Sequence, residues 1–336
     1  MFDLDRVQME PENWGLDRLD DPKLPMDGRY HYEYDGSGVD VYVLDTGIYM
    51  EHIDFSTITD INGRNHQRNI TCGYDAFATE QHQSMKGQCI DTHGHGTHVA
   101  GIVGGLQHGV AKHTNLISVK VYDDDIGARL STILAGFDYV LGQKLKQPER
   151  PTIINFSLSG PRCKMVNRIV QGLVNDANIV MIVSAGNDAT SSCDKSPASA
   201  DVSVITVSAI NNMDLMPPYA NYGSCIDILA PGHAIVSAWI RDPHDVARLS
   251  GTSLAAPHVV AGKYPMIVPI TKGFVLSQNC SFVALAVVAA MYLQRNPEWK
   301  PSALWTAVES HALRDLVSNI PPSTPNLIVT TNDLQY

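Results

Sequence analysis

Four residues of this sequence have the types and surroundings that nucleophilic catalysis requires. Asp45 follows a run of apolar residues, His95 lies between two glycines, and Ser253 precedes a stretch of small residues. A serine hydroxyl attacks a carbonyl carbon when an imidazole removes its proton and a carboxylate orients that imidazole. Asn187 carries an amide that can donate to the resulting oxyanion. Together the four predict acyl transfer through a serine nucleophile.

Each of the four also has an ordinary structural explanation. An aspartate after a strand commonly closes a turn, Gly186-Asn187 is a typical turn pair, and a serine before a helix is a common cap. The combination is more specific than any single residue. Asp45, His95 and Ser253 follow one another in one of the chain orders known for catalytic triads, which favours the chemical explanation.

A metal site is the alternative chemistry. His93, His95 and His98 fall within six consecutive positions, and imidazole is a common zinc ligand. Metallohydrolases with a His-x-His motif place an aspartate immediately before a third histidine, whereas this sequence has Thr97 there. We therefore favour the serine reaction, which needs no cofactor for catalysis, and keep a metallohydrolase using the three histidines as the alternative.

The elements that must position these residues alternate between strands and helices. Four apolar runs predict buried strands, and two stripes with helical spacing predict amphipathic helices between them. This alternation indicates an α/β fold, a doubly wound and mainly parallel sheet with helices on both faces. Sites in such sheets form beyond the carboxyl ends of the strands, where Asp45 and Asn187 are expected. The strand runs are residues 39–44, 116–121, 152–156 and 179–183; the helical stripes lie within 133–141 and 166–174.

The composition fits a soluble globular protein. Of the 336 residues 44% are hydrophobic and 18% charged, with a net charge of −11 and no run rich in Lys or Arg, which argues against a nucleic-acid partner. No stretch of about 20 apolar residues is free of breakers, so no membrane span is expected. The first residues predict no signal peptide in this chain. Without a repeat or long linker, we expect one domain over residues 1–336.

The motifs around the four residues resemble the subtilisin family of serine peptidases, and most closely its proteinase K branch. The resemblance covers roughly residues 14–327. Further segments similar to that branch are Asn155-Phe156-Ser157-Leu158-Ser159-Gly160, Asn221-Tyr222-Gly223-Ser224, Asp227-Ile228-Leu229-Ala230-Pro231-Gly232, and Ser318-Asn319-Ile320-Pro321 followed by Pro325-Asn326-Leu327.

The resemblance implies a single catalytic domain and a serine endopeptidase of broad specificity, with polypeptides as substrates. It implies Asp45, His95 and Ser253 as the triad, with Asn187 in the oxyanion hole. A substrate peptide would lie extended between residues 122–127 and the segment of Ser157, Leu158, Ser159 and Gly160. Ser159 departs from the family, which usually has glycine there. A catalytically impaired member of the family that acts by binding is the second alternative.

The resemblance also implies features that support the fold. It pairs Cys193 with Cys225 in a disulfide, suggests Cys72 with Cys89 as a second, and leaves Cys163 and Cys280 without partners. It implies a structural calcium ion held by Asp227 and backbone carbonyls around Val202 and Val204. An extracellular, monomeric protein is expected by the same resemblance, together with an inhibitory propeptide that this chain lacks.

One segment interrupts the family pattern. After Gly262 the helix begun by Ser253 should continue, but residues 263–282 contain Pro265, Pro269 and Gly273. Proline within a helix costs about 3 kcal/mol or more. We predict that 263–282 is a non-native insertion, a retained intron, because joining its flanks restores a continuous helical pattern; a functional insertion loop is the alternative.

Overall fold

The computed structural model describes residues 7–331 except 33, 57, 60–64, 67–68, 79–87, 201–203 and 260–287. The predicted insertion at 263–282, with its Cys280, and Val202 of the predicted calcium site lie outside the described residues. The helices are α1 (Trp14–Asp20), α2 (His95–Gly104), α3 (Leu130–Lys146), α4 (Lys164–Asn175), α5 (Thr252–His258), α6 (Val288–Arg295) and α7 (Pro301–His311), with 3-10 turns η1 (Ile53–Phe55) and η3 (Ser192–Asp194).

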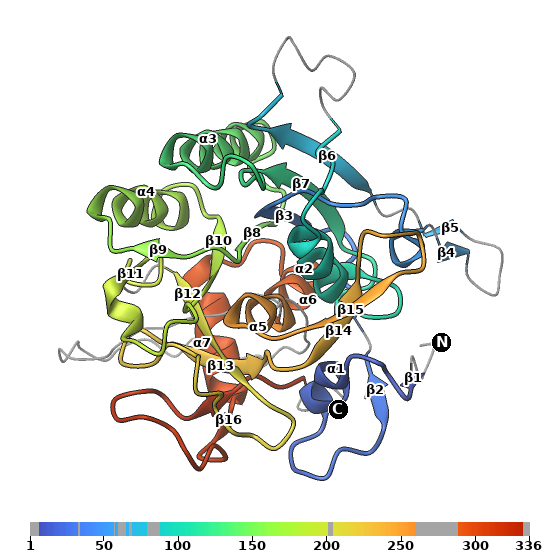
Figure 1. Ribbon diagram of the computed structural model, residues 1–336, viewed down its shortest axis with the longest axis vertical. Helices are drawn as coiled ribbons and strands as arrows, with labels where there is room; N and C mark the ends of the chain where they lie inside the picture. The colour runs from blue at the N-terminus through green and yellow to red at the C-terminus, as the bar shows by residue number, and fades with distance from the viewer. Residues whose placement is uncertain are drawn as a thin grey trace, which may run out of the picture.

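The described strands form one large sheet and several short pairs (Figure 1). The large sheet has the order β16-β17-β13-β12-β10-β8-β3-β7-β6, and every adjacent pair is parallel except β16 with β17. Its strands are β3 (Asp40–Asp45), β6 (Ile70–Asp75), β7 (Asn115–Lys120), β8 (Thr152–Phe156), β10 (Val180–Ser184), β12 (Ile205–Ile210), β13 (Ile228–Pro231), β16 (Leu313–Arg314) and β17 (Leu327–Ile328). The antiparallel pairs are β1 (Val7–Met9) with β2 (Arg29–His31), β4 (Ile58–Thr59) with β5 (Asn65–His66), β9 (Gly160–Pro161) with β11 (Lys195–Ser196), and β14 (Ile235–Ala238) with β15 (Val246–Leu249).

The two faces of the sheet are both apolar, which explains why the strands read as continuous apolar runs. Along β3, Val41 and Val43 point into one core cluster, and Tyr42 and Leu44 point into the other. The first cluster is covered by α1, α2, α5, α6 and α7, and the second by α3 and α4, which Figure 1 shows side by side. The predicted doubly wound α/β fold is confirmed.

Two disulfides are present among the described residues, and one of them begins at Cys72 in β6, the last strand of the large sheet. Cys193 is bonded to Cys225, and Cys72 to Cys89, with Cα–Cα distances of 5.2 and 5.3 Å. Both predicted pairings are therefore present. Cys163 is the free cysteine among the described residues. No helix in the described part of the chain has the length and apolar character that crossing a membrane requires.

Candidate active site

The carboxyl end of β3 brings an aspartate to a histidine at the start of α2. Asp45 is fully buried, and His95 Nδ1 lies 2.7 Å from its Oδ1. Because a carboxylate only accepts, the Nδ1–H donates this bond, and Nε2 is left as the ring nitrogen that can take up a proton. Asp45 Oδ1 also accepts from the backbone N–H of Thr46 at 2.8 Å. The ring is thus held in one tautomer and orientation.

A second buried carboxylate fixes the start of α2. Asp91 Oδ1 accepts from Thr46 Oγ1 and from the backbone N–H groups of His93 and Gly94. Asp91 Oδ2 accepts from the backbone N–H and the hydroxyl of Thr97. Gly94 has φ +98°, and a Cβ there would lie 2.7 Å from the indole ring of Trp239, so only glycine fits this turn.

The electrostatic surroundings of His95 favour its charged form. Burial alone would lower the pKa of His95, but the charge and hydrogen bond of Asp45 and the charge of Asp91 outweigh it. The pKa of His95 therefore lies above its ordinary value of 6.5. An imidazole so placed can accept a proton and be stabilised as imidazolium by the carboxylate behind it.

The serine and the asparagine meet at the start of α5. Ser253 is the second residue of α5 and is half-buried, while most of that helix is buried. Asn187 follows β10 in a turn where Gly186 has φ +99°. Its Oδ1 accepts from the backbone N–H of Thr252 at 2.8 Å, which fixes the amide with its Nδ2 group available as a donor. The bond to Thr252 therefore places the side-chain amide of Asn187 next to Ser253.

A cleft of about 350 Å³ brings three of the four predicted residues together. His95, Asn187 and Ser253 line it, and Asp45 lies behind His95. Of the predicted substrate-binding segment, Ser157, Leu158 and Ser159 line the cleft, and Tyr122 of the opposite predicted wall also does; Gly160 lies beyond them in β9. Ser157 Oγ donates to the backbone carbonyl of Ser253 at 2.9 Å, joining the wall to the helix.

The alternative metal site gains no support. Burial lowers the pKa of His98 to about 3, and its Nε2 bonds the carbonyl of Ala247 at 3.0 Å. In the part of the chain that the structure describes, His93, His95 and His98 do not bring their ring nitrogens within ligand distance of one another. The predicted calcium ligand Asp227 is buried, and its Oδ2 accepts from the backbone N–H of Thr206 at 2.6 Å.

Sequence reasoning missed the residues that hold the two site loops together. Lys120 at the end of β7 is buried, and its Nζ donates to the carbonyls of Thr46 and Ile90 at 2.9 and 2.8 Å. Asp91 joins Thr46 after β3 to the start of α2 by its own hydrogen bonds. An aspartate shortly before a helix is a cap signal that could have marked Asp91, but the helix at 95–104 was itself not predicted. A lysine at the end of an apolar strand could likewise have marked Lys120 as a buried side chain that needs acceptors.

Comparison with known proteins identifies the class to which this fold and site belong. Residues 36–263 match the model of the subtilase family, and the chain belongs to that family. The predicted relation to subtilisin-like serine peptidases is therefore confirmed, and the relatives are named serine proteinases or proteinases.

Individual relatives extend over nearly the whole chain. An extracellular serine proteinase of Thermus sp. (strain Rt41A) is 36% identical over 96% of this chain and 66% of its own length. Proteinase T of Parengyodontium album is 33% identical over 96% of this chain and 94% of its own. The crystal structure of a cold adapted subtilisin-like serine proteinase has a TM-score of 0.75 at 32% identity, covering 95% of this chain and 97% of that one. This chain thus spans just under two thirds of the Thermus relative and nearly all of the other two.

Proposed function

We propose that this chain is a serine endopeptidase that cleaves peptide bonds through an acyl-enzyme on Ser253. The observation that carries the proposal is the His95–Asp45 bond of 2.7 Å beside a cleft that Ser253 and Asn187 also line. Ser253 Oγ attacks the scissile carbonyl carbon while His95 Nε2 takes its proton. His95 then returns that proton to the leaving amine, and water hydrolyses the acyl-enzyme by the same route.

The oxyanion of each tetrahedral intermediate needs donors that are already in place. The Asn187 amide and the backbone N–H of Ser253 serve this purpose. Ser253 lies in the first turn of α5, and Asn187 is hydrogen-bonded to the neighbouring Thr252. The substrate backbone lies between Tyr122 and the segment 157–160 as an added strand. Contacts of this kind read main chain more than side chain, which supports broad specificity.

The test compares the chain with its Ser253→Ala variant on a chromogenic peptide and with a serine-directed covalent probe. The variant should lose nearly all cleavage and all labelling, while Ser302→Ala on α7, outside the cleft, should keep both. Activity that survives in Ser253→Ala but disappears with a chelator would point to the metallohydrolase. Binding of peptides without cleavage by the unmodified chain would instead support an impaired enzyme that acts by binding.

A variant of the oxyanion donor separates catalysis from simple substrate contact. Asn187→Ala should lower kcat by ~10²–10³ with KM nearly unchanged, because the amide binds the transition state more tightly than the substrate. Steady-state kinetics on the same peptide give both constants. A change confined to KM would show that Asn187 only contacts substrate.

We also propose a structural calcium ion at Asp227. Burial raises the pKa of Asp227 well above its ordinary value, because among the described residues only hydrogen bonds from Thr206 offset desolvation. A carboxyl so buried is stable when it is protonated or when a cation accompanies it. Oxygen ligands of this kind suit calcium, whose role there would be rigidity. Calcium should raise the melting temperature of the unmodified chain but not of Asp227→Asn; equal melting with calcium and with chelator would refute the site.

Secretion is part of the same proposal. The two disulfides are typical of oxidising compartments, and the Thermus relative is named an extracellular proteinase. A monomeric state and an inhibitory propeptide stay predictions. Both are checked by expressing the protein through a secretory route and measuring its mass before and after maturation.

A further inference from the structure

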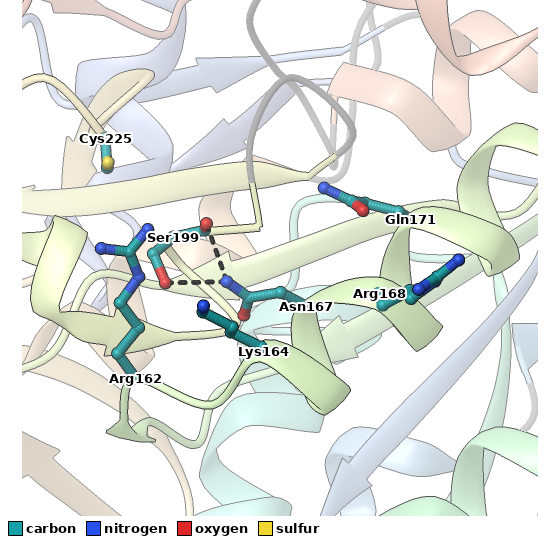
Figure 2. Close-up of a pocket in the computed structure, with 7 residues that line it drawn as sticks. All are labelled: Arg162, Lys164, Asn167, Arg168, Gln171, Ser199 and Cys225. Carbon is teal, nitrogen blue, oxygen red and sulfur yellow. Dashed lines mark hydrogen bonds between the residues drawn. The ribbon is translucent and has the colours of Figure 1, made fainter.

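A second hollow lies beside α4, away from the residues assigned to catalysis. Its volume is about 680 Å³, and three cationic side chains, Arg162, Lys164 and Arg168, line it together with polar groups (Figure 2). In the part of the chain that the structure describes, no carboxylate is among its lining residues. All three cations are exposed at the surface. The hollow is therefore open and positively charged.

This charge is unusual for the chain that carries it. The sequence has 35 acidic and 24 basic residues, yet none of the described residues that line the hollow is acidic. Within the described residues, the ion pairs of lysine and arginine are made by Arg18, Lys120, Arg150, Lys195 and Arg241. The three cations of the hollow are not among them.

The helix itself would favour the opposite charge at this place. Lys164 is the first residue of α4, whose first turn has no acidic residue, although the amino end of a helix carries partial positive charge. Arg168 lies four residues later, where like charges repel. Both arrangements slightly destabilise the free protein. The cation at the helix end and the pair of like charges both become favourable when an anionic group lies among these side chains. Such a group is attracted by the cations and by the partial positive charge of the helix end together.

The floor under the cations is fixed by hydrogen bonds. Asn167 is buried, and its Nδ2 donates to the carbonyl and the hydroxyl of Ser199 at 2.8 and 3.0 Å, as Figure 2 shows. Its Oδ1 accepts from Ser196 Oγ at 2.6 Å. Gln171 Nε2 donates to the carbonyl of Ala200 at 2.7 Å. The cations thus project from a rigid frame, which lowers the entropic cost of binding.

The hollow is adjacent to the proposed substrate cleft along the chain. Ser159 lines the cleft and Arg162 lines the hollow. Three residues span at most about 11 Å. Between them, β9 is paired with β11, which also leads to Ser199 at the floor of the hollow. A polypeptide lying along 157–160 and continuing past Gly160 would reach Arg162 within a few residues.

We propose that this hollow is an exosite for an acidic segment of the polypeptide substrate, outside the residues next to the scissile bond. The inference rests on the proposed peptidase function and adds a substrate class to it. Aspartate and glutamate side chains of the substrate pair with Arg162, Lys164 and Arg168. Polypeptides with an acidic stretch a few residues from the cleaved bond are therefore bound more tightly than neutral ones.

The experiment uses two fluorogenic peptides with identical residues around the scissile bond, one extended by four aspartates and the other by four serines. The acidic extension should lower KM about tenfold, the product of three exposed ion pairs of roughly twofold each. The triple variant Arg162→Gln, Lys164→Gln, Arg168→Gln should lose this advantage and keep its activity on the serine peptide. Lys146→Gln, an exposed cation on α3, is the matched control. About 0.5 M salt should also remove the advantage.

Direct binding keeps the inference separate from the proposed function. Anisotropy of the labelled peptides with the Ser253→Ala protein measures affinity without cleavage. If the unmodified chain proved inactive, the peptidase proposal would fail, but this binding measurement would still test the exosite. Equal affinity for both peptides, or an advantage retained in the triple variant, would overturn the exosite. The exosite would also be overturned if inorganic phosphate bound to the hollow while the aspartate extension gave no gain in peptide affinity. The triple variant should melt no lower than the unmodified chain, since it removes repulsion in α4.

Discussion

At the scale of single residues, the two carboxylates near His95 have different tasks. Asp45 accepts from the ring directly, whereas Asp91 acts on the ring only through its charge and through the backbone of the adjoining turn. Both raise the pKa of His95. The proposed reaction needs neutral His95 to remove the serine proton, so the acid limb of activity reports this pKa.

The first prediction concerns that acid limb. Since the pKa of His95 is raised above 6.5, the group stays protonated and inactive to a higher pH than an ordinary histidine. The value of kcat/KM for a neutral peptide should fall with acid around a midpoint above 6.5. Asp45→Asn should lower activity ~10⁴-fold, because the amide no longer holds the required tautomer. A midpoint at or below 6.5 in the unmodified chain would contradict this electrostatic picture.

The candidate site was predictable at the residue scale because its motifs are short. Asp45, His95 and Ser253 each stand in a few neighbouring residues that carry the signal. Long-range partners left no such signal. Lys120 contacts the loop after β3 from 74 positions away, and burying a lysine at a strand end depends on two carbonyls that only the folded chain brings together.

At the scale of elements, the start of α2 is tied to the end of β3 through Asp91. Its two oxygens accept five hydrogen bonds: one from Thr46 after β3, two from the turn before α2 and two from Thr97 in the first turn of α2. The amide of an asparagine would turn an NH₂ group toward donors that need an acceptor. The position of His95 therefore depends on a carboxylate that does not touch the substrate, which makes Asp91 a positioning residue.

The second prediction follows from this arrangement. Asp91→Asn should lower kcat by roughly 10–100-fold, because small displacements of a catalytic group are costly. It should also shift the acid limb of the pH profile toward lower pH, since one of the charges that raise the pKa of His95 is gone. A role in stability alone would leave that limb in place. Asp138→Asn, an exposed residue on α3 that does not line the cleft, is the control and should change neither quantity.

The elements themselves were predictable because apolar periodicity reflects burial on both faces of the sheet. The run 152–156 coincides with β8, and the runs 39–44 and 116–121 differ from β3 and β7 by one residue at each end. The short pairs were not predicted. β9 and β11 have two residues each, too few for any periodicity, and they pair only because the larger sheet brings their loops together.

At the scale of the whole molecule, the disulfide between Cys193 and Cys225 closes a long loop with 32 positions between its ends. This loop includes β12 and, with Ser199 and Cys225, part of the wall of the cationic hollow, and it ends two residues before Asp227 of the proposed calcium site. In the chain-entropy model a loop of this length contributes about 3–4 kcal/mol to the free energy of unfolding.

The third prediction is that replacing both cysteines lowers stability but spares the chemistry. Cys193→Ala with Cys225→Ala should reduce the free energy of unfolding by about 3–4 kcal/mol in urea titration. The value of kcat for a neutral peptide, measured well below the melting temperature, should change little. Loss of kcat with unchanged stability would indicate that the bridge positions the cleft instead.

The last prediction concerns residues 263–282, whose flanks belong to one structural unit. Before the segment, Ala256 and Val259 are buried in the first core cluster, and after it Ala289 and Met291 are buried in the same cluster. Both flanks thus share one hydrophobic environment, as expected if a single helical pattern were interrupted. Deleting 263–282 should raise soluble yield and specific activity together. The comparison needs the full-length chain expressed in parallel and active-site titration of both. A full-length chain that folds well and loses activity on deletion would show instead that the segment is a functional loop.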